Sequence, residues 1–479
     1  MATDSTRFQA IISHCKEYGF IFPSSEIYDG LSAVYDYGQW GSELKKNVKD
    51  YWWKSMTQMH ENIVGIDAAI FMHPTTWKAS GHVDNFNDPM IDNKDSKKRY
   101  RVDHLIEAKA DELEKDGKKS EADALLAEMD RFLAAEDFVG LKKLIEDSKI
   151  KCSISGTANW TDVRQFNLMF STELGSVTDD ASIIYLRPET AQGIFVNFLN
   201  VQKTGRMKIP FGIAQIGKAF RNEIVARQFI FRMREFEQME MQYFIRPGTE
   251  NEWYEFWKEA RMKWHLSLGI PKEKLHFKDH VKLAFYAKAA CDVEYEFPIG
   301  FKEVEGIHSR TDHDLKQHQA FSKKKMQYFD PELNQNYIPY VIETSIGVDR
   351  TVMMLLSEAF EEQDLSTAEK KDSRSVLKFP PQLAPVKLAV LPLVKKDGLP
   401  EIARKIMDDC KSHFRCFYEE KDTIGKRYRR MDAIGTPFCV TVDHQSKEDG
   451  TVTIRYRDSM QQERILVDNV RSIVQKQIL

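Results

Sequence analysis

The feature that most constrains the fold is a stretch in which two strand-like runs flank a short arginine-rich loop. It spans residues 211–244, FGIAQIGKAFRNEIVARQFIFRMREFEQMEMQYF. Alternate residues of an extended strand share a face, so this pattern predicts a hairpin with polar residues in register on both arms. The two faces of its second arm carry Phe236, Gln238, Glu240 and Gln242 on one side and Glu237, Met239, Met241 and Tyr243 on the other.

The arginines of this hairpin suit a nucleoside triphosphate. Arg221 and Glu223 follow each other at strand spacing on the first arm, and the tip carries Arg227, Arg232 and Arg234. A guanidinium on a rigid strand can fork onto an α-phosphate and stabilise the charge that develops there during attack. A half-exposed hairpin with solvated charges would show the same pattern, so this stretch alone leaves both interpretations open.

A strand followed by a turn and an apolar helix is predicted for residues 339–360, PYVIETSIGVDRTVMMLLSEAF. Glu343 and Ser345 lie two apart on the strand and therefore share a face. Asp349 and Arg350 fall in the first turn of the helix, where free N–H groups and the helix dipole favour anions. An ordinary strand–turn–helix with an Asp cap is the simpler interpretation.

Two further segments place charged residues at the start of a helix. In YLRPETAQGIFVNF, residues 185–198, Pro188 fits a helix start, and Glu189 is explained most simply as a capping residue. The buried stripe of that helix is expected to be Ile194, Phe195 and Phe198. In DVEYEFPIGFKEVEGIHSRTDHDLKQH, residues 292–318, Arg310 lies between a strand end and an acidic helix start.

Shifts in composition predict several domains, and a chain of 479 residues suggests about two to four. Residues of about 93–147 are rich in Lys, Glu, Asp and Ala, with apolar residues at helical spacing. They predict an insertion of two or three surface helices, broken at Gly117 and Gly140. Residues 361–385 are polar and then proline-punctuated, with little to bury, which predicts a linker.

The last segment, residues 386–479, alternates strand-like and helix-like runs and predicts a compact α/β domain of about a hundred residues. It holds 18 Lys and Arg against 14 Asp and Glu, whereas the whole chain has 69 against 73. A solvated helix face explains its basic cluster more simply than an RNA-contacting surface does. The cluster consists of Lys426, Arg427, Arg429 and Arg430.

The composition excludes several classes of protein. With 42% hydrophobic and 30% charged residues and a net charge of −4, any RNA contact must come from local patches. Six cysteines show no C-x-x-C pair and no histidine at zinc spacing, so we expect small buried residues, no disulfide framework and no structural zinc. No stretch reaches the ~18 apolar residues of a membrane span, and the N-terminus lacks a signal-peptide pattern. We therefore expect no membrane partner and a reducing, cytoplasmic location.

In combination, the arginine-bearing hairpin and the later strand–Gly–x–Asp–Arg–helix resemble motifs 2 and 3 of the class II aminoacyl-tRNA synthetases. FRNEI with REFEQME, RPETAQGIF, VIETSIGVDR, and DVEYEFPIGF with SRTDHDL are similar to the dimeric glycyl-tRNA synthetases within that class. IGKRYRRMDAIGTPFCVTVD and TVTIRYRDSMQQERI resemble the anticodon-binding domain of that family. The resemblance covers nearly the whole chain.

The resemblance implies an α+β fold, with a mainly antiparallel sheet flanked by helices. The catalytic domain would span residues 1–384, with a helical insertion at about 91–160 and a linker at about 361–384. An α/β anticodon-binding domain would follow at 385–479. It also implies a homodimer that activates glycine with ATP and Mg²⁺ and transfers it to tRNA(Gly), with no metal held by a protein cluster.

The resemblance also implies roles for individual residues. Arg221 and Arg350 would be catalytic. The ATP site would consist of Arg221, Asn222, Glu223, Phe231, Arg232, Phe236, Glu303, Val304, Gly347, Val348, Asp349 and Arg350. The glycine site would consist of Arg101, Glu189, Phe236, Gln238, Glu240, Arg310, Glu343 and Ser345. The tRNA would contact Lys426, Arg427, Arg429 and Arg430.

Three departures from the wording of the class or family stand out. Ser345 replaces the glycine that begins motif 3 across class II, as in the glycine enzymes. Gln39 and Trp40 stand where Pro-Leu is typical of motif 1, the segment that the resemblance places at the dimer interface. GIHSR replaces the commoner GIANR and keeps Arg310.

Three rival functions fit parts of the pattern. An enzyme for alanine, serine or proline is disfavoured by the three glutamates and Ser345. An accessory subunit without chemistry would be expected to lose Arg221 or Arg350, and this chain keeps both. An adenylating enzyme that loads a carrier protein would not need the C-terminal domain.

Overall fold

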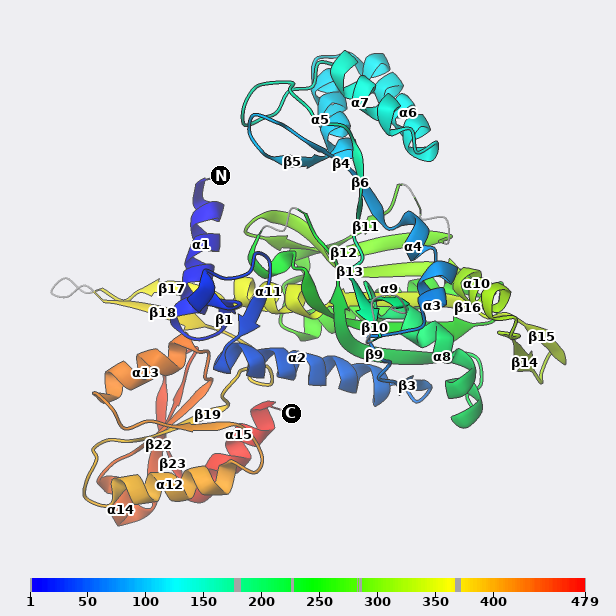
Figure 1. Ribbon diagram of the computed structural model, residues 1–479. Helices are drawn as coiled ribbons and strands as arrows, with labels where there is room; N and C mark the ends of the chain where they lie inside the picture. The colour runs from blue at the N-terminus through cyan, green and yellow to red at the C-terminus, as the bar shows by residue number, and fades with distance from the viewer. Residues whose placement is uncertain are drawn as a thin grey trace. The chain divides into compact units, whose positions relative to one another are not determined.

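The computed structural model describes residues 2–175, 182–224, 228–281, 283, 287–366 and 372–478 (Figure 1). The chain divides into two compact units. The first comprises residues 1–69, 189–219 and 226–479, and the second comprises residues 70–188 and 220–225. None of the described helices is both long and apolar enough to cross a lipid bilayer.

A mainly antiparallel sheet organises the first unit. Seven of the described strands follow the order β11-β12-β13-β16-β10-β9-β3, in which the neighbours from β11 to β10 are antiparallel and β3 runs parallel to β9 at the edge. The strands are β3 (Ile63–Gly65), β9 (Phe211–Phe220), β10 (Glu235–Ile245), β11 (Leu275–Asp279), β12 (Ala289–Phe297), β13 (Gly300–Thr311) and β16 (Tyr340–Gly347). This arrangement confirms the predicted fold class and the two arms of the hairpin.

Helices cover this sheet and form its core with it. They are α1 (Ala2–Glu17), α2 (Gln39–Thr57), α8 (Ala191–Thr204), α9 (Glu250–Ser267), α10 (His313–Ser322) and α11 (Val348–Ala359). Met239, Met241 and Tyr243 of β10 are buried in one cluster with Trp52 of α2 and Trp257 of α9. The predicted alternation of β10 is therefore confirmed, since Met239, Met241 and Tyr243 share the face that packs into this core, whereas Gln238, Glu240 and Gln242 lie on the other face.

The two predicted helix starts are also confirmed. α8 begins after Thr190, and Ile194, Phe195 and Phe198 are fully buried. β16 passes through Gly347 directly into α11. Short strands and 3-10 turns complete this part of the chain: β1 (Ile21–Pro23), η1 (Glu26–Tyr28), β2 (Tyr35–Tyr37), η3 (Phe229–Phe231), η4 (Lys272–Lys274), β14 (Tyr328–Asp330) and β15 (Gln335–Tyr337).

The C-terminal domain has the predicted α/β architecture. Its strands follow the order β20-β19-β21-β22-β23, with the first three parallel and the last two antiparallel. The elements are β19 (Leu388–Pro392), α12 (Leu399–Cys410), β20 (Cys416–Tyr418), α13 (Ile424–Ala433), β21 (Phe438–Val442), α14 (Gln445–Asp449), β22 (Thr451–Tyr456), β23 (Gln462–Leu466), η5 (Val467–Asn469) and α15 (Val470–Ile478).

The segment expected to be a linker with little to bury is structured and partly buried. It forms a hairpin of β17 (Phe360–Asp364) and β18 (Ser373–Leu377). Phe379 and Leu383 after it are fully buried in the main core. The prediction was wrong because it averaged over composition, whereas Val376, Leu377, Phe379 and Leu383 pack inward.

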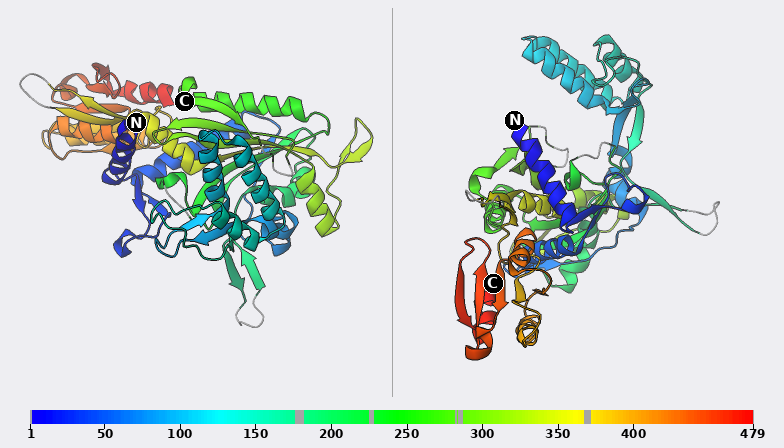
Figure 2. Two further views of the ribbon diagram at one scale, coloured as in Figure 1. Left: turned by 90° about the horizontal axis from the view of Figure 1, so that it is seen from above. Right: turned by 90° about the vertical axis from the view of Figure 1, so that its left-hand side faces the viewer.

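The second unit has a core of its own. Helices α5, α6 and α7 lie side by side (Figures 1 and 2, cyan) and bury Ile106, Leu125 and Ile145 with Trp160. The elements are α3 (Pro74–Ala79), α4 (His82–Asn85), β4 (Asn87–Asp92), β5 (Arg99–Arg101), α5 (Val102–Lys115), α6 (Lys119–Ala134), α7 (Phe138–Asp147), β6 (Arg164–Asn167), β7 (Ser171–Leu174) and β8 (Ser182–Tyr185).

The helices of the insertion were predicted correctly, but one of the two predicted breaks, at Gly140, is wrong. Gly117 adopts a left-handed φ of 77° between α5 and α6, as a break requires. Gly140 lies inside α7, where its amide donates to the carboxylate of the N-cap residue Asp137 at 2.8 Å. A Cβ added to Gly140 would lie 2.4 Å from the Phe132 ring. This glycine permits close packing and does not end a helix. The three-stranded sheet β5-β4-β6 was not anticipated.

A buried charge network joins the β17–β18 hairpin to the C-terminal domain. Arg374 of β18 donates to Asp432 of α13 at 3.0 Å, and Arg455 of β22 donates to both oxygens of the same carboxylate at 2.8 and 3.0 Å. Arg374 and Asp432 are fully buried, and the Arg455 side chain is 6% exposed. One carboxylate thus compensates two buried guanidinium groups.

Asp432→Asn should therefore lower the free energy of unfolding by about 3–5 kcal/mol, because it leaves buried positive charge uncompensated. Urea unfolding followed by circular dichroism measures this. Asp372→Asn is the matched control, since Asp372 pairs with Arg429 at the surface and its loss should cost less than about 1 kcal/mol. Equal losses in the two variants would contradict this account of the network.

Candidate active site

Polar residues of three neighbouring strands meet on one face of the sheet. The pairing of β13 with β16 places His308 opposite Glu343, and the pairing of β10 with β16 places Gln242 opposite Glu343 and Glu240 opposite Ser345. The register therefore brings Glu240 and Glu343 close together, although they lie 103 positions apart in the chain.

Glu343 is held as a charged carboxylate by three donors. Arg310 Nη1 donates to Oε2 at 2.9 Å, and Gln242 Nε2 donates to the same oxygen at 2.6 Å. His308 Nδ1 lies 2.7 Å from Oε1. Burial favours the neutral acid, but Arg310 and His308 outweigh it and lower the pKa of Glu343 to about 2.

Glu240 has the opposite character. Its side chain is 1% exposed, Oε2 lies 2.5 Å from Thr190 Oγ1, and Oε1 accepts from Gln242 Nε2 at 2.7 Å. Burial and the carboxylates of Glu343 and Glu189 raise its pKa well above that of an ordinary glutamate. In the absence of a cation, Glu240 therefore keeps its proton to a higher pH than an ordinary glutamate does.

Arg310 is surrounded by carboxyl groups. Its Nε and Nη2 atoms fork onto Asp314 at 2.9 Å each, while Nη1 reaches Glu343. Gln192 Nε2 bridges Asp314 at 3.1 Å and Glu189 at 3.0 Å. Two carboxylates, Asp314 and Glu343, thus share one guanidinium, and Glu189 and Glu240 lie near it, so the site is short of positive charge. The predicted contact between Arg310 and a substrate carboxylate stays a prediction.

Gln238 and Ser345 close the side of the site next to Glu240. Gln238 Nε2 donates to Ser345 Oγ at 3.2 Å, and its Oε1 accepts from the Thr190 amide at 3.2 Å. The start of α8 is fixed in turn by Gln215, which donates to the Thr190 carbonyl at 3.1 Å. The sequence predicted neither Gln215 nor Thr190 as part of the site, although both occur in strongly patterned segments.

Three residues predicted for the nucleotide come together although they lie far apart in the chain. The Arg350 guanidinium lies 4.5 Å from the centroid of the Phe231 ring, and its Nε donates to the Phe231 carbonyl at 3.3 Å. Its Nη1 reaches the Glu303 carboxylate at 3.0 Å and the Glu303 carbonyl at 3.2 Å. Arg350 is therefore oriented by partners from β13 and from the hairpin tip.

Three other predicted nucleotide residues, Val304, Val348 and Asp349, face the interior of the protein. Asp349 is buried and accepts from Tyr37 Oη at 2.6 Å, Lys45 Nζ at 2.7 Å and the Glu237 amide at 2.8 Å. This carboxylate fastens α2 and β10 to the turn and is occupied by protein partners. The side chains of Val348 and Val304 are buried, Phe236 packs partly against the core, and Arg232 is exposed.

The predicted residues of the second unit have partners of their own. Arg221 donates to the Pro188 carbonyl at 3.1 Å and lies 5.6 Å from the Phe86 ring centroid. Strand β9 ends at Phe220, so Arg221, Asn222 and Glu223 follow the strand. The pattern had predicted Arg221 and Glu223 on the strand itself. Arg101 forks onto Asp103 at 3.0 and 2.5 Å. Arg227 lies outside the described residues.

The basic cluster of the C-terminal domain is only partly a surface. Arg427 is buried and donates to the carbonyls of Pro392, Glu419 and Leu393 at 2.6, 3.1 and 3.2 Å. Its predicted contact with RNA is wrong, because its guanidinium supports loops within the domain. Lys426 is exposed, and the half-buried Arg429 and Arg430 form ion pairs with Asp372 and Asp422.

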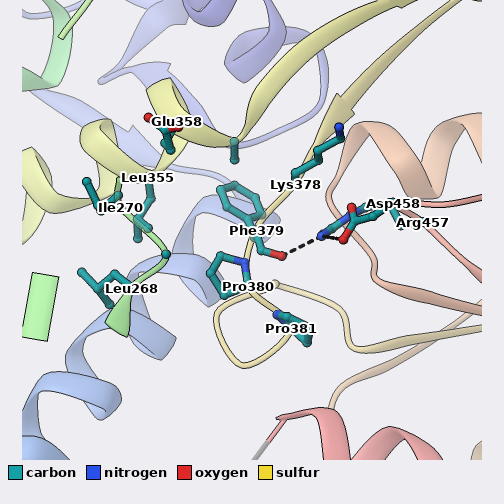
Figure 3. Close-up of a pocket in the computed structure, with 12 residues that line it drawn as sticks. Leu268, Ile270, Leu355, Glu358, Lys378, Phe379, Pro380, Pro381, Arg457 and Asp458 are labelled. Atoms are coloured by element: carbon teal, nitrogen blue, oxygen red, sulfur yellow. Dashed lines mark hydrogen bonds and ion pairs between the residues drawn. The ribbon is translucent and has the colours of Figure 1, made fainter. Parts of the chain in front are cut away.

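A cavity of about 190 Å³ lies elsewhere in the first unit, beside the segment that follows β18 (Figure 3). Arg457 donates to the Phe379 carbonyl at 2.8 Å beside it. Its lining contains none of the residues predicted for the active site. The residues around it are Leu268, Gly269, Ile270, Leu355, Glu358, Ala359, Lys378, Phe379, Pro380, Pro381, Arg457 and Asp458.

Three family models match the chain. The model of the "tRNA synthetase class II core domain (G, H, P, S and T)" matches residues 170–359, and that of the "Glycyl-tRNA synthetase insertion domain 1" matches residues 88–122 and 117–168. The model of the "Anticodon binding domain" matches residues 387–477.

The chain is similar along nearly its whole length to proteins named Glycine--tRNA ligase. That of Chlorobaculum tepidum is 57% identical over 457 residues, which cover 95% of this chain and 96% of the relative. That of Treponema denticola is 51% identical over 461 residues, covering 95% and 94%. That of Macrococcus caseolyticus is 50% identical over 474 residues, covering 98% of each.

The raised pKa of Glu240 predicts a specific pH dependence of stability. Above the ordinary glutamate pKa, the folded chain holds a proton on Glu240 that the unfolded chain has released. The free energy of unfolding of the ligand-free protein should therefore fall as pH rises toward the raised pKa, by at most about 1.4 kcal/mol per pH unit from this group. Glu240→Gln should remove this contribution, because its amide can donate to Thr190 and accept from Gln242.

Urea unfolding at about pH 5.5 and pH 8 measures the difference. Glu240→Gln should be more stable than the unchanged protein at the higher pH, and the gap should narrow at the lower one. Glu255→Gln, at an exposed position of α9, is the control and should follow the unchanged protein. A gap that is the same at both pH values would contradict the proposed protonation of Glu240.

Proposed function

Because the chain belongs to the family of glycine--tRNA ligases, within the class II aminoacyl-tRNA synthetases, we propose that it activates glycine with ATP and transfers the glycyl group to the 3′ end of tRNA(Gly). The observation that carries this proposal is the group formed by the buried Glu240, Glu343 and Arg310 with the half-buried Glu189. These side chains leave a site that is short of positive charge and suits an ammonium group.

Glycine is the amino acid that such a site can select. A substrate without a side chain offers only an ammonium and a carboxylate, so selection must combine carboxylates for the amine with steric exclusion of a β-carbon. Glu189, Glu240 and Glu343 would receive the ammonium. The hydrogen-bonded pair of Gln238 and Ser345 would occupy the space that a larger side chain needs.

The nucleotide would bind beside this group. Arg350, oriented by Phe231 and Glu303, would cover the base and the distal phosphates, and Phe236 would support adenine. Arg221 would bind the α-phosphate, with Asn222 and Glu223 beside it. Mg²⁺ would enter with the nucleotide and neutralise phosphate charge, while the protein side chains orient the reactants.

The reaction would proceed in two steps at one site. The glycine carboxylate attacks the α-phosphate and displaces pyrophosphate, and the terminal ribose hydroxyl of the tRNA then attacks the glycyl carbonyl and displaces AMP. Because no described side chain stands out as an obligatory general base, catalysis would rest on orientation and electrostatic stabilisation. Arg221 and Arg350 would stabilise the charge on the phosphates.

The remaining partners follow from the family. The C-terminal domain would bind the tRNA, with Lys426, Arg429 and Arg430 as candidate contacts. We propose a homodimer that works in the cytoplasm, where translation takes place. The ring of Trp40 packs edge-to-face against Phe417 of the same chain, at 5.6 Å between ring centroids. This contact gives the unusual Trp40 a role within the subunit.

Amino-acid-dependent ATP–pyrophosphate exchange without tRNA tests the proposal. Exchange should occur with glycine and with none of the other nineteen amino acids, and Arg221→Ala should reduce it by about 100- to 1,000-fold. Exchange with another amino acid would overturn the pocket assignment. No exchange by the folded protein with Mg²⁺ would favour an accessory subunit that lacks chemistry.

The glycine KM should fall as pH rises. An ammonium group can pair with Glu240 only after this residue has lost its proton. At pH values below the raised pKa of Glu240, glycine binding therefore requires release of that proton. The KM for glycine in the exchange reaction should decrease by up to about tenfold per pH unit between about pH 6 and pH 8. A KM that is constant over this range would contradict a direct pairing of Glu240 with the substrate.

A further inference from the structure

A second group of polar side chains continues the same face of the sheet beyond Glu343. In the part of the chain that the structure describes, one set of three potential metal ligands brings its ligand atoms within 4.8 Å of one another: His280, Asp292 and His308. All three side chains are half-buried. They come from the end of β11, from β12 and from β13, which are neighbours in the sheet.

The strand register explains why these residues meet. The His280 amide donates to the Ala290 carbonyl at 3.0 Å, and Ala290 lies opposite His308. Asp292 follows Ala290 by two positions and therefore points to the same face. Asp292 Oδ1 lies 2.9 Å from His280 Nε2.

The His308 ring is oriented from two sides. Its Nδ1 is bonded to Glu343 at 2.7 Å, so the nitrogen it offers to a further ligand is Nε2. Gly306, opposite Asp292, leaves room for this ring, because a Cβ there would lie 2.7 Å from His308 Cε1. The imidazole is thus held in one orientation by a hydrogen bond and by the absence of a side chain.

We propose that His280, Asp292 and His308 bind a divalent transition metal ion, with Zn²⁺ as the ion that this donor set suits best. Two imidazoles and one carboxylate form a common set of three protein ligands for zinc, with water in the fourth position. The half-buried position gives an ion access from solvent. The expectation of no structural zinc came from linear spacing, and these three ligands are too far apart in the sequence to form a linear motif.

The ion would act on the active site through His308. A histidine bound to a metal through Nε2 carries its proton on Nδ1 and donates it to a neighbouring carboxylate. Here the carboxylate is Glu343, so the ion would fix the tautomer of His308 and the position of Glu343. This second effect rests on the proposed function, since it predicts tighter binding of glycine, whereas ion binding itself does not.

Titration of the chelator-treated full-length protein with Zn²⁺, without any substrate, tests ion binding. Calorimetry should find one Zn²⁺ per chain, and Co²⁺ should give the visible absorption of a site with nitrogen and oxygen ligands. His308→Ala and Asp292→Asn should each weaken binding by about 100-fold or more, since even indirect partners of a metal contribute 10- to 100-fold. Circular dichroism should show both variants folded.

His276→Ala is the matched control. His276 lies on β11 and pairs with Glu294. It is an imidazole on the same sheet that does not belong to the proposed metal site. It should bind Zn²⁺ like the unchanged protein. Absence of stoichiometric binding, or equal affinity in the unchanged protein and in His308→Ala, would overturn the site.

The effect on glycine is measured separately, by the KM in pyrophosphate exchange with and without Zn²⁺. The KM of the unchanged protein should fall several-fold when Zn²⁺ is added. His280→Ala, which does not touch Glu343, should show no such response. If one Zn²⁺ binds but the KM of the unchanged protein does not respond, the link to Glu343 is overturned while the site stands. If no amino acid supports exchange, the proposed function fails independently of the ion titration.

Discussion

The rest of the site depends on two buried glutamates that share too little positive charge. Glu343 is charged because Arg310 and His308 hold it so, and Glu240 next to it must then keep a proton. Burying two carboxylates this close is costly unless a cation lies among them. In the ligand-free protein this cost favours the protonated form of Glu240. An ammonium group would replace that proton. Selection of a small substrate through its ammonium group would then follow from the electrostatics of these carboxylates.

The sheet makes this arrangement possible. Its strands place hydrophobic residues of β10 on one face, against α2 and α9, and the glutamates on the other. The packed face supplies the rigidity that keeps Glu240 and Glu343 at fixed positions. Asp349, at the start of α11, accepts hydrogen bonds from Tyr37 and from Lys45 of α2 and so holds the end of β16 in place. The same polar face extends through His308 to Asp292 and His280. The proposed substrate site and the proposed ion site are thus parts of one layer of side chains.

Periodic and local features could be predicted from the sequence. The alternation of β10, the start of α8 at Thr190 and the strand–turn–helix at Gly347 all follow from neighbouring residues. The register between distant strands could not be predicted, so the donors to Glu343 and the group of His280, Asp292 and His308 stayed hidden. Composition also misled where single residues decide, as with the buried Phe379 of the expected linker. Arg427 shows the same limit, because its charge indicated a surface and its hydrogen bonds place it inside.

The account depends most directly on the proton held by Glu240. Calorimetry of glycine binding in two buffers with different ionisation enthalpies counts the protons released as the amino acid binds. Well below the raised pKa of Glu240, we predict release of about one proton per site, and none in Glu240→Gln if that variant still binds glycine. Binding of glycine without proton release by the unchanged protein would show that Glu240 is already charged and would contradict the account.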